Sequence, residues 1–200
     1  MKVKQPTSRE LQRQETFARV YETALEEFRR VGVDQTKVSE ICLRAKVAKG
    51  TFFFHFPTKD HVLLERQRRI SEAMAERIEH ELSEAADAKV FLARLTDIVL
   101  EEHQAVGDLE LVRQINLAIV RQGGSQRLSI VHTAFGNALS AQIRHLQQRG
   151  VLRKGIDAAK LADTLRLSFF GFLVNPQSSF DTSRPRIALL TSLLAEALMV

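Results

Sequence analysis

The sequence predicts an all-α protein of about nine helices, with a small N-terminal helix-turn-helix head and a larger helical domain. Apolar residues recur at spacings of three and four along most of the chain, and no alternating strand pattern holds for long. Glycine, proline and capping residues divide these stretches into segments of helical length. With 44% apolar and 26% charged residues, the 200-residue chain can bury a core. We place the head at residues 1–58 and the larger domain at residues 59–200.

A long first helix is expected to start at Thr7 or Ser8, either of which can cap it, and to run to about Arg30. Gly32 follows its end as a stop signal. The apolar stripe that should close the core of the head consists of Phe17, Val20, Tyr21, Ala24, Leu25 and Phe28. The polar arm before this helix, residues 1–7, either reaches a minor groove or contacts nothing.

Two short helices joined by a tight turn are predicted next. Thr36 stands before the first of them as its N-cap, and the helical pattern breaks at Lys46-Val47. The apolar stripe of this helix consists of Val38, Ile41, Cys42 and Ala45. The second helix runs from about Ala48 to Phe54 and ends before Pro57, because proline disfavours helical geometry in the preceding residue. Helices with so short a joint cross steeply, which is typical of a helix-turn-helix that lays its second helix in a major groove.

The second short helix separates an inner face from an outer face. Phe52 and Phe56 can point inward together, since they lie four residues apart. On the outer side Lys49 can contact a phosphate or a guanine edge, Thr51 can bond a phosphate, and Gly50 lets the backbone approach closely. The predicted DNA-binding residues are Lys37, Ser39, Ala48, Lys49, Gly50, Thr51, Phe53, Phe54, His55 and Lys59.

At these residues the chain resembles the tetracycline-repressor (TetR) family of bacterial transcription regulators. The DNA-binding motif of that family reads approximately T-x-x-x-x-I-A-x-x-A-G-V-S-x-G-x-[LIF]-Y-x-H-F-x-x-K-x-x-[LV]-L. The matching residues, in fixed register, are Thr36, Ile41, Ala45, Val47, Gly50, Phe52, His55, Phe56, Lys59, Val62 and Leu63. The resemblance implies a dimeric regulator, commonly a repressor, that binds a palindromic operator and is released by an effector held in the larger domain.

Four positions depart from the motif. Cys42 takes the place of a small alanine. Lys46 stands where the family has its turn glycine, so the turn is strained if this residue needs a positive φ. Ala48 replaces a serine or threonine and removes a helix cap. Phe53 replaces a tyrosine and removes a phenolic contact to the DNA backbone. We therefore expect operator binding to depend more on the remaining outer residues.

Basic residues are concentrated near the motif. Residues 1–60 contain twelve Lys and Arg against eight Asp and Glu, whereas residues 61–200 contain seventeen against sixteen. The net charge is +4 in the first segment and +1 in the second, which suits DNA binding by the head. The alternative is a solvated surface that happens to be basic, and the registered motif favours the first interpretation.

A fourth helix is expected from Lys59 to about Glu84. Because it connects the head to the larger domain, we expect it to transmit movement between them. Five more helices are predicted over residues 88–105, 109–121, 125–149, 157–174 and 184–199. Asp108, Ser125 and Asp157 are candidate caps. Breaks are expected at Gly107-Asp108, Gly123-Gly124, Gly150, Gly155-Ile156-Asp157 and from Asn175-Pro176 through Arg184-Pro185.

The last two predicted helices have wide apolar faces. The first face contains Leu161, Leu165, Phe169, Phe170, Phe172, Leu173 and Val174, and the second Ile187, Leu189, Leu190, Leu193, Leu194, Ala197 and Leu198. Such faces can pack against their copies around a two-fold axis as a four-helix bundle, which is the homodimer that the resemblance implies. Alternatively, both helices complete the core of the monomer, and periodicity does not separate the two possibilities.

Polar residues on otherwise apolar helices of the larger domain suggest a cavity for a small-molecule effector. The candidate pocket residues are Phe91, His103, Arg113, Asn116, His132, Phe135, Arg166, Phe169 and Phe170, and Asn137 is a further polar candidate. Taken singly, each polar residue is also explained as a core group bonded to the backbone, and each phenylalanine as packing. The sequence does not choose among lipids, aromatics, drugs and metabolites.

Other functional classes lack their signatures. The spacings of zinc sites, phosphate loops and nucleophile motifs are absent, and Gly123-Gly124-Ser125 lacks the lysine of a phosphate-binding loop. The single Cys42 excludes an internal disulfide and lies on an apolar stripe, as a buried small residue does. We therefore expect no enzymatic activity, no metal and no cofactor.

No stretch reaches the roughly 18 apolar residues of a membrane span, and the start of the chain has no signal-peptide core. We expect a cytoplasmic protein whose partners are double-stranded DNA, a small-molecule effector and a second copy of itself. The alternative is an all-helical module that has lost operator binding and uses its head to bind protein. Such a module would show no salt-dependent affinity for DNA.

Overall fold

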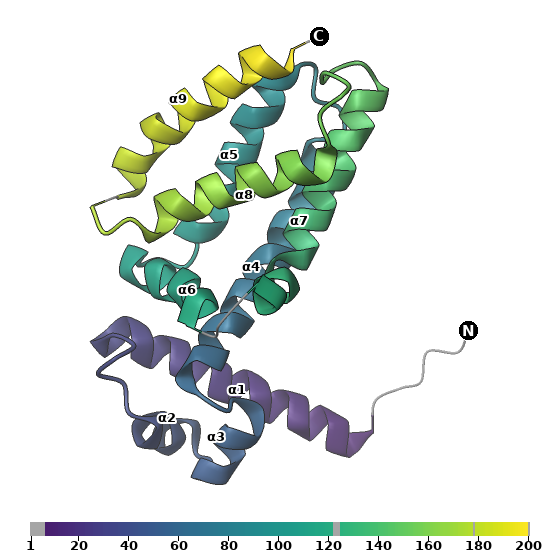
Figure 1. The fold of residues 1–200 in the computed structure, drawn as a ribbon. Coiled ribbons are helices and arrows are strands. Elements are labelled where there is room, and N and C mark those ends of the chain that lie inside the picture. The colour runs from purple at the N-terminus through teal and green to yellow at the C-terminus, as the bar shows by residue number, and fades with distance from the viewer. Residues whose placement is uncertain (1–6, 122–124, 178, 200) are drawn as a thin grey trace. The chain divides into compact units, whose positions relative to one another are not determined.

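The computed structural model describes residues 7–121, 125–177 and 179–199, with side chains in the seventh helix described from residue 134 onward. Within these ranges every regular element is a helix, which confirms the predicted all-α class (Figure 1). The chain divides into two compact units, residues 1–63 and residues 64–200. We call these the head unit and the body unit.

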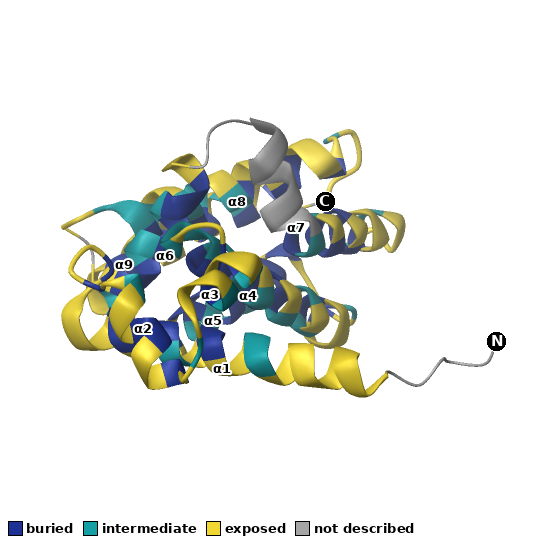
Figure 2. Cartoon of the chain, turned by 90° about the horizontal axis from the view of Figure 1, so that it is seen from below, coloured by how far each residue is buried: buried dark blue, intermediate teal, exposed yellow. Residues whose placement is uncertain are grey.

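The head unit contains α1 (Ser8–Val31), α2 (Val38–Ala45), α3 (Lys49–His55) and the start of α4 (Lys59–Glu81). Thr7 caps α1 as predicted, because its hydroxyl accepts from the Glu10 N–H while the Glu10 carboxylate accepts from the Thr7 N–H. Gly32 ends the helix with a φ of 82°. The first turns of α1 are exposed, and its buried residues all lie in its second half (Figure 2).

An apolar core joins the helices of the head unit. Its buried residues are Val20, Tyr21, Ala24, Leu25, Phe28, Ile41, Cys42, Ala45, Phe52, Phe56, Val62 and Leu63. Phe17, the remaining member of the predicted α1 stripe, is half-buried, and its ring centroid lies 4.9 Å from that of Phe56. Burial raises the pKa of the Cys42 thiol, so this side chain packs as a small protonated group.

The start of α2 differs from the prediction. Thr36 does not cap the helix, because its hydroxyl donates to the Gly32 carbonyl at 2.7 Å. The N-cap is Lys37, whose side chain makes no capping hydrogen bond. The Thr36 N–H also donates to Gly32, at 3.2 Å. Thr36 therefore closes the loop after α1, where a carbonyl just past a helix end needs a donor.

A buried carboxylate fastens α2 to α1. The Glu27 side chain is 1% exposed and accepts from Arg30 on the same helix at 2.6 Å and from Arg44 on α2. The hydrogen bond from Arg30, followed by that from Arg44, holds the pKa of Glu27 below its ordinary value against the opposing effect of burial. Two charged partners therefore offset the desolvation of this group.

The body unit contains the rest of α4 together with α5 (Ala88–Gln104), α6 (Leu109–Arg121), α7 (Ser125–Gln148), α8 (Ala158–Val174) and α9 (Phe180–Leu198). α5 packs along α9, and α8 packs against α6 and α7 (Figure 1). Asp157 caps α8 as predicted, accepting from the Lys160 N–H at 2.8 Å. The Asp108 carboxylate accepts from Glu110 N at 3.0 Å, and Ser125 lies outside the side chains described. None of the helices in the described ranges combines the length and hydropathy that crossing a bilayer requires.

The last helix corrects the prediction that Arg184-Pro185 marks a break. α9 begins at Phe180, and Pro185 lies inside it. Ser179 and Thr182 form a capping box at its start, and Arg184 pairs with Asp97 of α5 at 2.6 Å. These contacts, with packing against α5, offset the backbone hydrogen bond that the proline cannot donate.

The apolar faces of α8 and α9 are only partly used inside the body unit. Leu165, Phe169 and Ile187 are buried. By contrast Leu167 of α8 is 56% exposed, and Leu189 and Leu193 of α9 are 64% and 58% exposed. The two α9 leucines lie four residues apart and so share one helix face. The monomer therefore leaves part of the predicted dimer surface uncovered.

Candidate nucleic-acid interface and effector pocket

The turn between α2 and α3 has a left-handed residue at its centre. Lys46 is the C-cap of α2, with φ 54° and ψ 50°, and is the non-glycine residue with positive φ in the described ranges. Arg19 of α1 supports the turn, since its Nε donates to the Ala45 carbonyl at 2.9 Å. The structure thus confirms that a positive φ is needed where the sequence has lysine, a conformation that glycine adopts without a steric penalty.

Replacing Lys46 by glycine is expected to stabilise the head unit by about 1 kcal/mol, because the left-handed conformation penalises a residue with a Cβ by roughly that amount. In a chain of this size such a gain raises the melting temperature by roughly 2–4 °C, which differential scanning calorimetry would measure. Lys46→Ala is the matched control, since it removes the same charge at the same position but keeps the Cβ at a φ of 54°. Equal melting temperatures for the two variants would contradict the strain.

Helix α3 buries one side and exposes the other. Phe52 is fully buried, whereas Phe53 and Phe54 are 49% and 66% exposed. Lys49 and Gly50 are exposed. Thr51 is half-buried, because it lies at the border between the two faces. On α2, the predicted contacts Lys37 and Ser39 are exposed as well. Ala48 is the N-cap of α3 and makes no side-chain hydrogen bond there, as its lack of a hydroxyl predicts.

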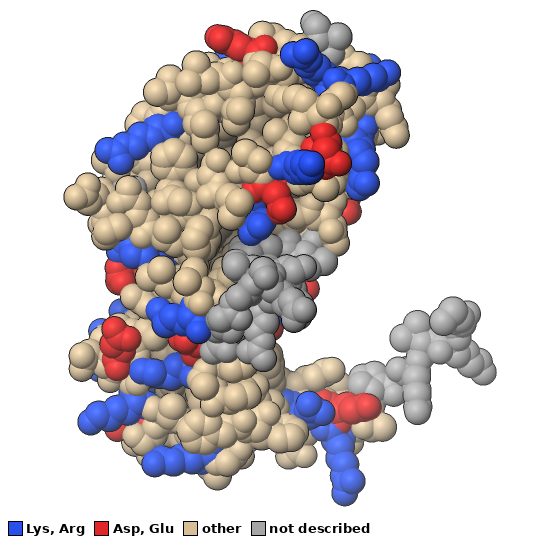
Figure 3. Space-filling model, viewed as in Figure 1, with Lys and Arg blue, Asp and Glu red and all other residues tan. Residues whose placement is uncertain are grey.

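A residue of α1 that the sequence analysis did not single out joins this surface. The Arg13 guanidinium carbon lies 5.1 Å from the ring centroid of Phe54, a cation–π contact. His55 lies edge-on to Phe17 and to Phe54. Burial first, and Arg13 second, lower the pKa of His55 below its ordinary value, so the imidazole is neutral at pH 7 in the free head unit. Figure 3 shows Lys and Arg side chains on the outer surface of the head unit.

Lys59, predicted to contact phosphate, has partners inside the head unit. Its Nζ donates to the carbonyls of Val33 at 2.6 Å, Asp34 at 3.2 Å and Thr36 at 3.0 Å. An ammonium group has three hydrogens, and these three acceptors use them all. Lys59 therefore holds the loop between α1 and α2 against the first turn of α4, and the contact to phosphate remains only a prediction.

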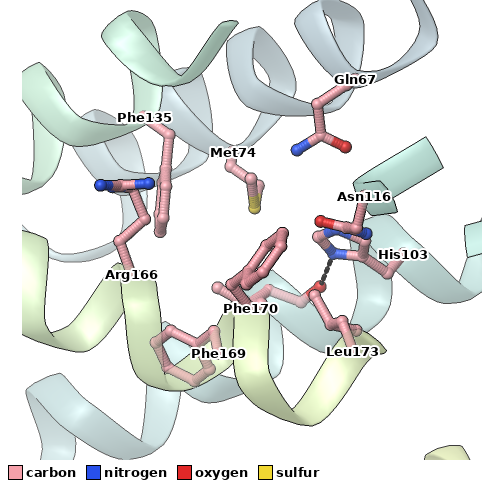
Figure 4. A pocket seen from close by; sticks show the side chains of 10 residues that line it. Gln67, Met74, His103, Asn116, Phe135, Arg166, Phe169, Phe170 and Leu173 are labelled. Atoms are coloured by element: carbon pink, nitrogen blue, oxygen red, sulfur yellow. Dashed lines mark hydrogen bonds between the residues drawn. The ribbon is translucent and has the colours of Figure 1, made fainter. Parts of the chain in front are cut away.

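Five helices of the body unit surround a small internal pocket (Figure 4). It is lined by Gln67, Met74, Val99, His103, Asn116, Phe135, Arg166, Phe169, Phe170 and Leu173. The cavity has a volume of about 20 Å³, which is room for a single water-sized group. Most of its wall is apolar, with a few polar side chains from α4, α5, α6 and α8, a composition typical of small-molecule sites.

The polar groups of the pocket are largely held by their own helices. The His103 Nδ1 donates to the Val99 carbonyl at 2.7 Å, the contact drawn as a dashed line in Figure 4. Asn116 donates to the Val112 carbonyl at 2.9 Å. Burial lowers the pKa of His103 to about 4, so its ring is neutral at physiological pH. Arg166 pairs with Asp163 at 3.1 Å.

The structure brings six of the nine predicted pocket residues together: His103, Asn116, Phe135, Arg166, Phe169 and Phe170. Phe91 is buried away from the pocket, and Arg113 instead pairs with Glu110 and donates to the Asn175 carbonyl at 3.3 Å. His132 lies outside the side chains described, and Asn137 is exposed. The pocket is also lined by four residues outside the predicted set, namely Gln67, Met74, Val99 and Leu173. For Gln67 a signal existed, because it interrupts the apolar stripe of α4.

Comparison with known proteins assigns the head unit. The family model described as bacterial regulatory proteins of the tetR family matches residues 20–65, which include α2, the Lys46 turn and α3. Residues 20–65 therefore match the DNA-binding segment of the TetR family of transcriptional regulators. The fold of the chain agrees with that assignment outside the matched segment too, as solved structures show.

Two solved TetR-type structures and one curated relative illustrate the similarity. Thermus thermophilus FadR, a TetR-family transcriptional repressor solved with lauroyl-CoA, has a TM-score of 0.69 and 21% identity, covering 88% of this chain and 93% of that one. Bacillus subtilis FadR, solved with stearoyl-CoA, has a TM-score of 0.67 and 22% identity, covering 90% and 97%. The fatty acid metabolism regulator protein of Bacillus subtilis is 27% identical over 150 residues, which are 73% of this chain and 75% of the relative.

These TetR-family relatives are regulators rather than enzymes. Within the family's DNA-binding motif, the structure decides what two of the departures mean. Lys46 adopts a left-handed conformation, which glycine accommodates without a steric penalty, and Ala48 leaves the start of α3 without a side-chain cap.

Proposed function

We propose that this protein is a TetR-family regulator that represses transcription by binding a palindromic operator as a homodimer, and that an acyl-CoA thioester releases it. The observation that carries the proposal is the division of α3. One face is anchored by the fully buried Phe52, while Lys49, Phe53 and Phe54 face outward. Such a helix enters a major groove with its exposed side, where lysine meets phosphate or guanine and an aromatic ring meets a thymine methyl.

Dimerisation is proposed to use α8 and α9. The exposed side chains Leu167, Leu189 and Leu193 are the apolar surface that these helices leave open in the monomer. Gly171 of α8 is also exposed, and a Cβ added there would meet nothing within 4 Å in the monomer, so the backbone can be approached closely. A two-fold pair of α8–α9 faces would form a four-helix bundle and present two α3 helices to successive major grooves.

The pocket of the body unit supports the choice of an effector with an apolar chain. Met74, Val99, Phe135 and Leu173 belong to its largely apolar wall, and the two compared FadR structures hold lauroyl-CoA and stearoyl-CoA. A chain of that length needs far more than the present 20 Å³, so binding must displace wall residues such as the half-buried Phe170.

Helix α4 is proposed to couple the two ligands. It is one continuous helix from Lys59 to Glu81, so it carries Lys59 of the head unit and also Gln67 and Met74 of the pocket. An effector that moves the pocket side of α4 would change the separation of the two α3 helices. The effector then favours the released state by its differential affinity, and the operator must weaken effector binding by the same factor.

This role includes no catalysis and places the protein in the cytoplasm, where the DNA of a bacterial cell lies. Selection of bound duplexes from a random pool by the full-length protein would test the proposal. We expect an enriched palindrome whose affinity falls with salt and with added dodecanoyl-CoA. Lys49→Ala should change affinity at particular operator positions, whereas Lys37→Ala should weaken all duplexes alike. Folded dimeric protein that enriches no sequence at low salt would refute operator binding.

A further inference from the structure

Two buried hydrogen-bond acceptors face the pocket without a donor among the described residues. They are Nε2 of His103 and Oε1 of Gln67. Both residues line the pocket, and their side chains point toward it from α5 and α4 (Figure 4). His103 is 2% exposed and Gln67 is 1% exposed, so bulk water does not satisfy them. Buried polar atoms are nearly always paired, and two unpaired atoms at one cavity indicate a missing partner.

The hydrogen-bonding polarity of His103 is fixed by the fold. Its Nδ1 lies 2.7 Å from the Val99 carbonyl oxygen, and a carbonyl oxygen can only accept, so Nδ1 carries the proton. With its pKa lowered to about 4 by burial, the ring holds only this one proton at neutral pH. Nε2 therefore presents a lone pair to the cavity and can only accept. The Gln67 amide can rotate to present either its oxygen or its nitrogen to the cavity. His103, which can only accept there, therefore determines that the missing partner is a hydrogen-bond donor.

Two other polar side chains of the pocket are held by partners on their own helices. Asn116 donates to the Val112 carbonyl at 2.9 Å within α6. Arg166 is paired with Asp163 at 3.1 Å, on its own helix. Apart from Gln67, the remaining lining residues are apolar and supply no N–H or O–H from their side chains. No side chain among the described residues donates to His103 Nε2, and a molecule that enters the pocket can supply that donor.

We infer that the effector carries an O–H or N–H group on the part that enters this pocket, and that this group donates to His103 Nε2 and lies beside Gln67. The inference rests on the proposed function, because it specifies the chemistry of the effector in the same pocket. Among acyl thioesters it selects a chain bearing a hydroxyl over an unsubstituted chain. The cavity volume of about 20 Å³ already fits a hydroxyl-sized group beside these two residues.

Two matched pairs of probes test the inference on the full-length dimer by isothermal titration calorimetry. The first pair is dodecanoyl-CoA and hydroxydodecanoyl-CoA, with the hydroxyl placed at successive positions of the chain. The second pair is phenol and fluorobenzene, which have nearly the same shape but differ in the O–H donor. We expect the donor-bearing member of a pair to bind about tenfold tighter, since its absence leaves a buried acceptor unpaired.

Two variants connect that preference to the residues. In His103→Phe the acceptor is lost, so the donor-bearing probe should bind no tighter than the donor-free probe, because its O–H finds no lone pair on the phenylalanine ring. In Gln67→Met the preference should shrink, and the melting temperature should stay equal to that of the native protein or rise. Gln142→Met is the matched control, because Gln142 is a buried glutamine whose Nε2 donates to the Leu82 carbonyl at 2.7 Å, and its loss should lower the melting temperature.

The outcomes separate this inference from the proposed function. If neither thioester binds but phenol outcompetes fluorobenzene in a His103-dependent manner, the acyl class is wrong and the donor requirement stands. If both thioesters bind and release DNA equally well, the proposed function stands and the donor requirement falls. A preference that persists in both His103→Phe and Gln67→Met overturns the assignment, as does the failure of all four probes to bind.

Discussion

Replacing Leu189 by arginine is expected to turn the dimer into a monomer and to lower affinity for a palindromic operator by at least about hundredfold, the usual range for losing one of two linked binding events. Leu189 is 64% exposed on α9, beside Leu193 on the same face. A guanidinium at this point would meet its symmetry copy and desolvate without a partner. Affinity for an isolated half-site should not change, because the head unit is untouched.

Light scattering across a protein dilution series and fluorescence anisotropy on full and half operators would measure both effects. Val90→Arg is the matched control, since Val90 is a 48% exposed apolar residue on α5, outside the α8–α9 surface. It should remain dimeric and bind normally. A Leu189→Arg protein that stays dimeric with native operator affinity would mean that another surface joins the two copies.

Replacing Lys59 by methionine is expected to destabilise the head unit by about 2 kcal/mol, within the range measured for hydrogen bonds to charged groups. The Nζ donates to three carbonyls of the loop between α1 and α2, and methionine has no donor to replace it. Val33 and Thr36, two residues whose carbonyls would lose this partner, are themselves buried. Urea unfolding followed by circular dichroism would show a lower midpoint.

Salt titrations of operator binding distinguish this role from a phosphate contact. If Lys59 only positions the loop, Lys59→Met should weaken DNA binding while leaving the slope of log affinity against log salt unchanged. If it contacts phosphate, the slope should fall by about one while stability is unchanged. Lys49→Met is the matched control, since Lys49 is exposed on α3. This variant should keep the stability of the native protein while its DNA binding changes.

The sequence was sufficient for the helical class, the helix-turn-helix head and the identity of the outer face of α3. These features depend on periodicity and on turn and capping residues, which act over a few neighbouring positions. Three polar pocket residues, His103, Asn116 and Arg166, were predictable because a polar group on an apolar stripe is visible in the sequence, and three phenylalanines were predictable as candidate walls. Lys46 was predictable as a glycine position only through the resemblance to the TetR motif.

Only the tertiary structure decided which distant groups meet. Lys59 is separated from the carbonyls of Val33, Asp34 and Thr36 by more than twenty positions, so no local pattern shows that its charge is already engaged. The helical status of Pro185 likewise depended on packing against α5 and on the pair between Arg184 and Asp97. Hydrogen bonds and ion pairs are short-range in space but not in sequence. Pairing, and the lack of a donor to His103 Nε2 among the described residues, therefore become visible only in the folded chain.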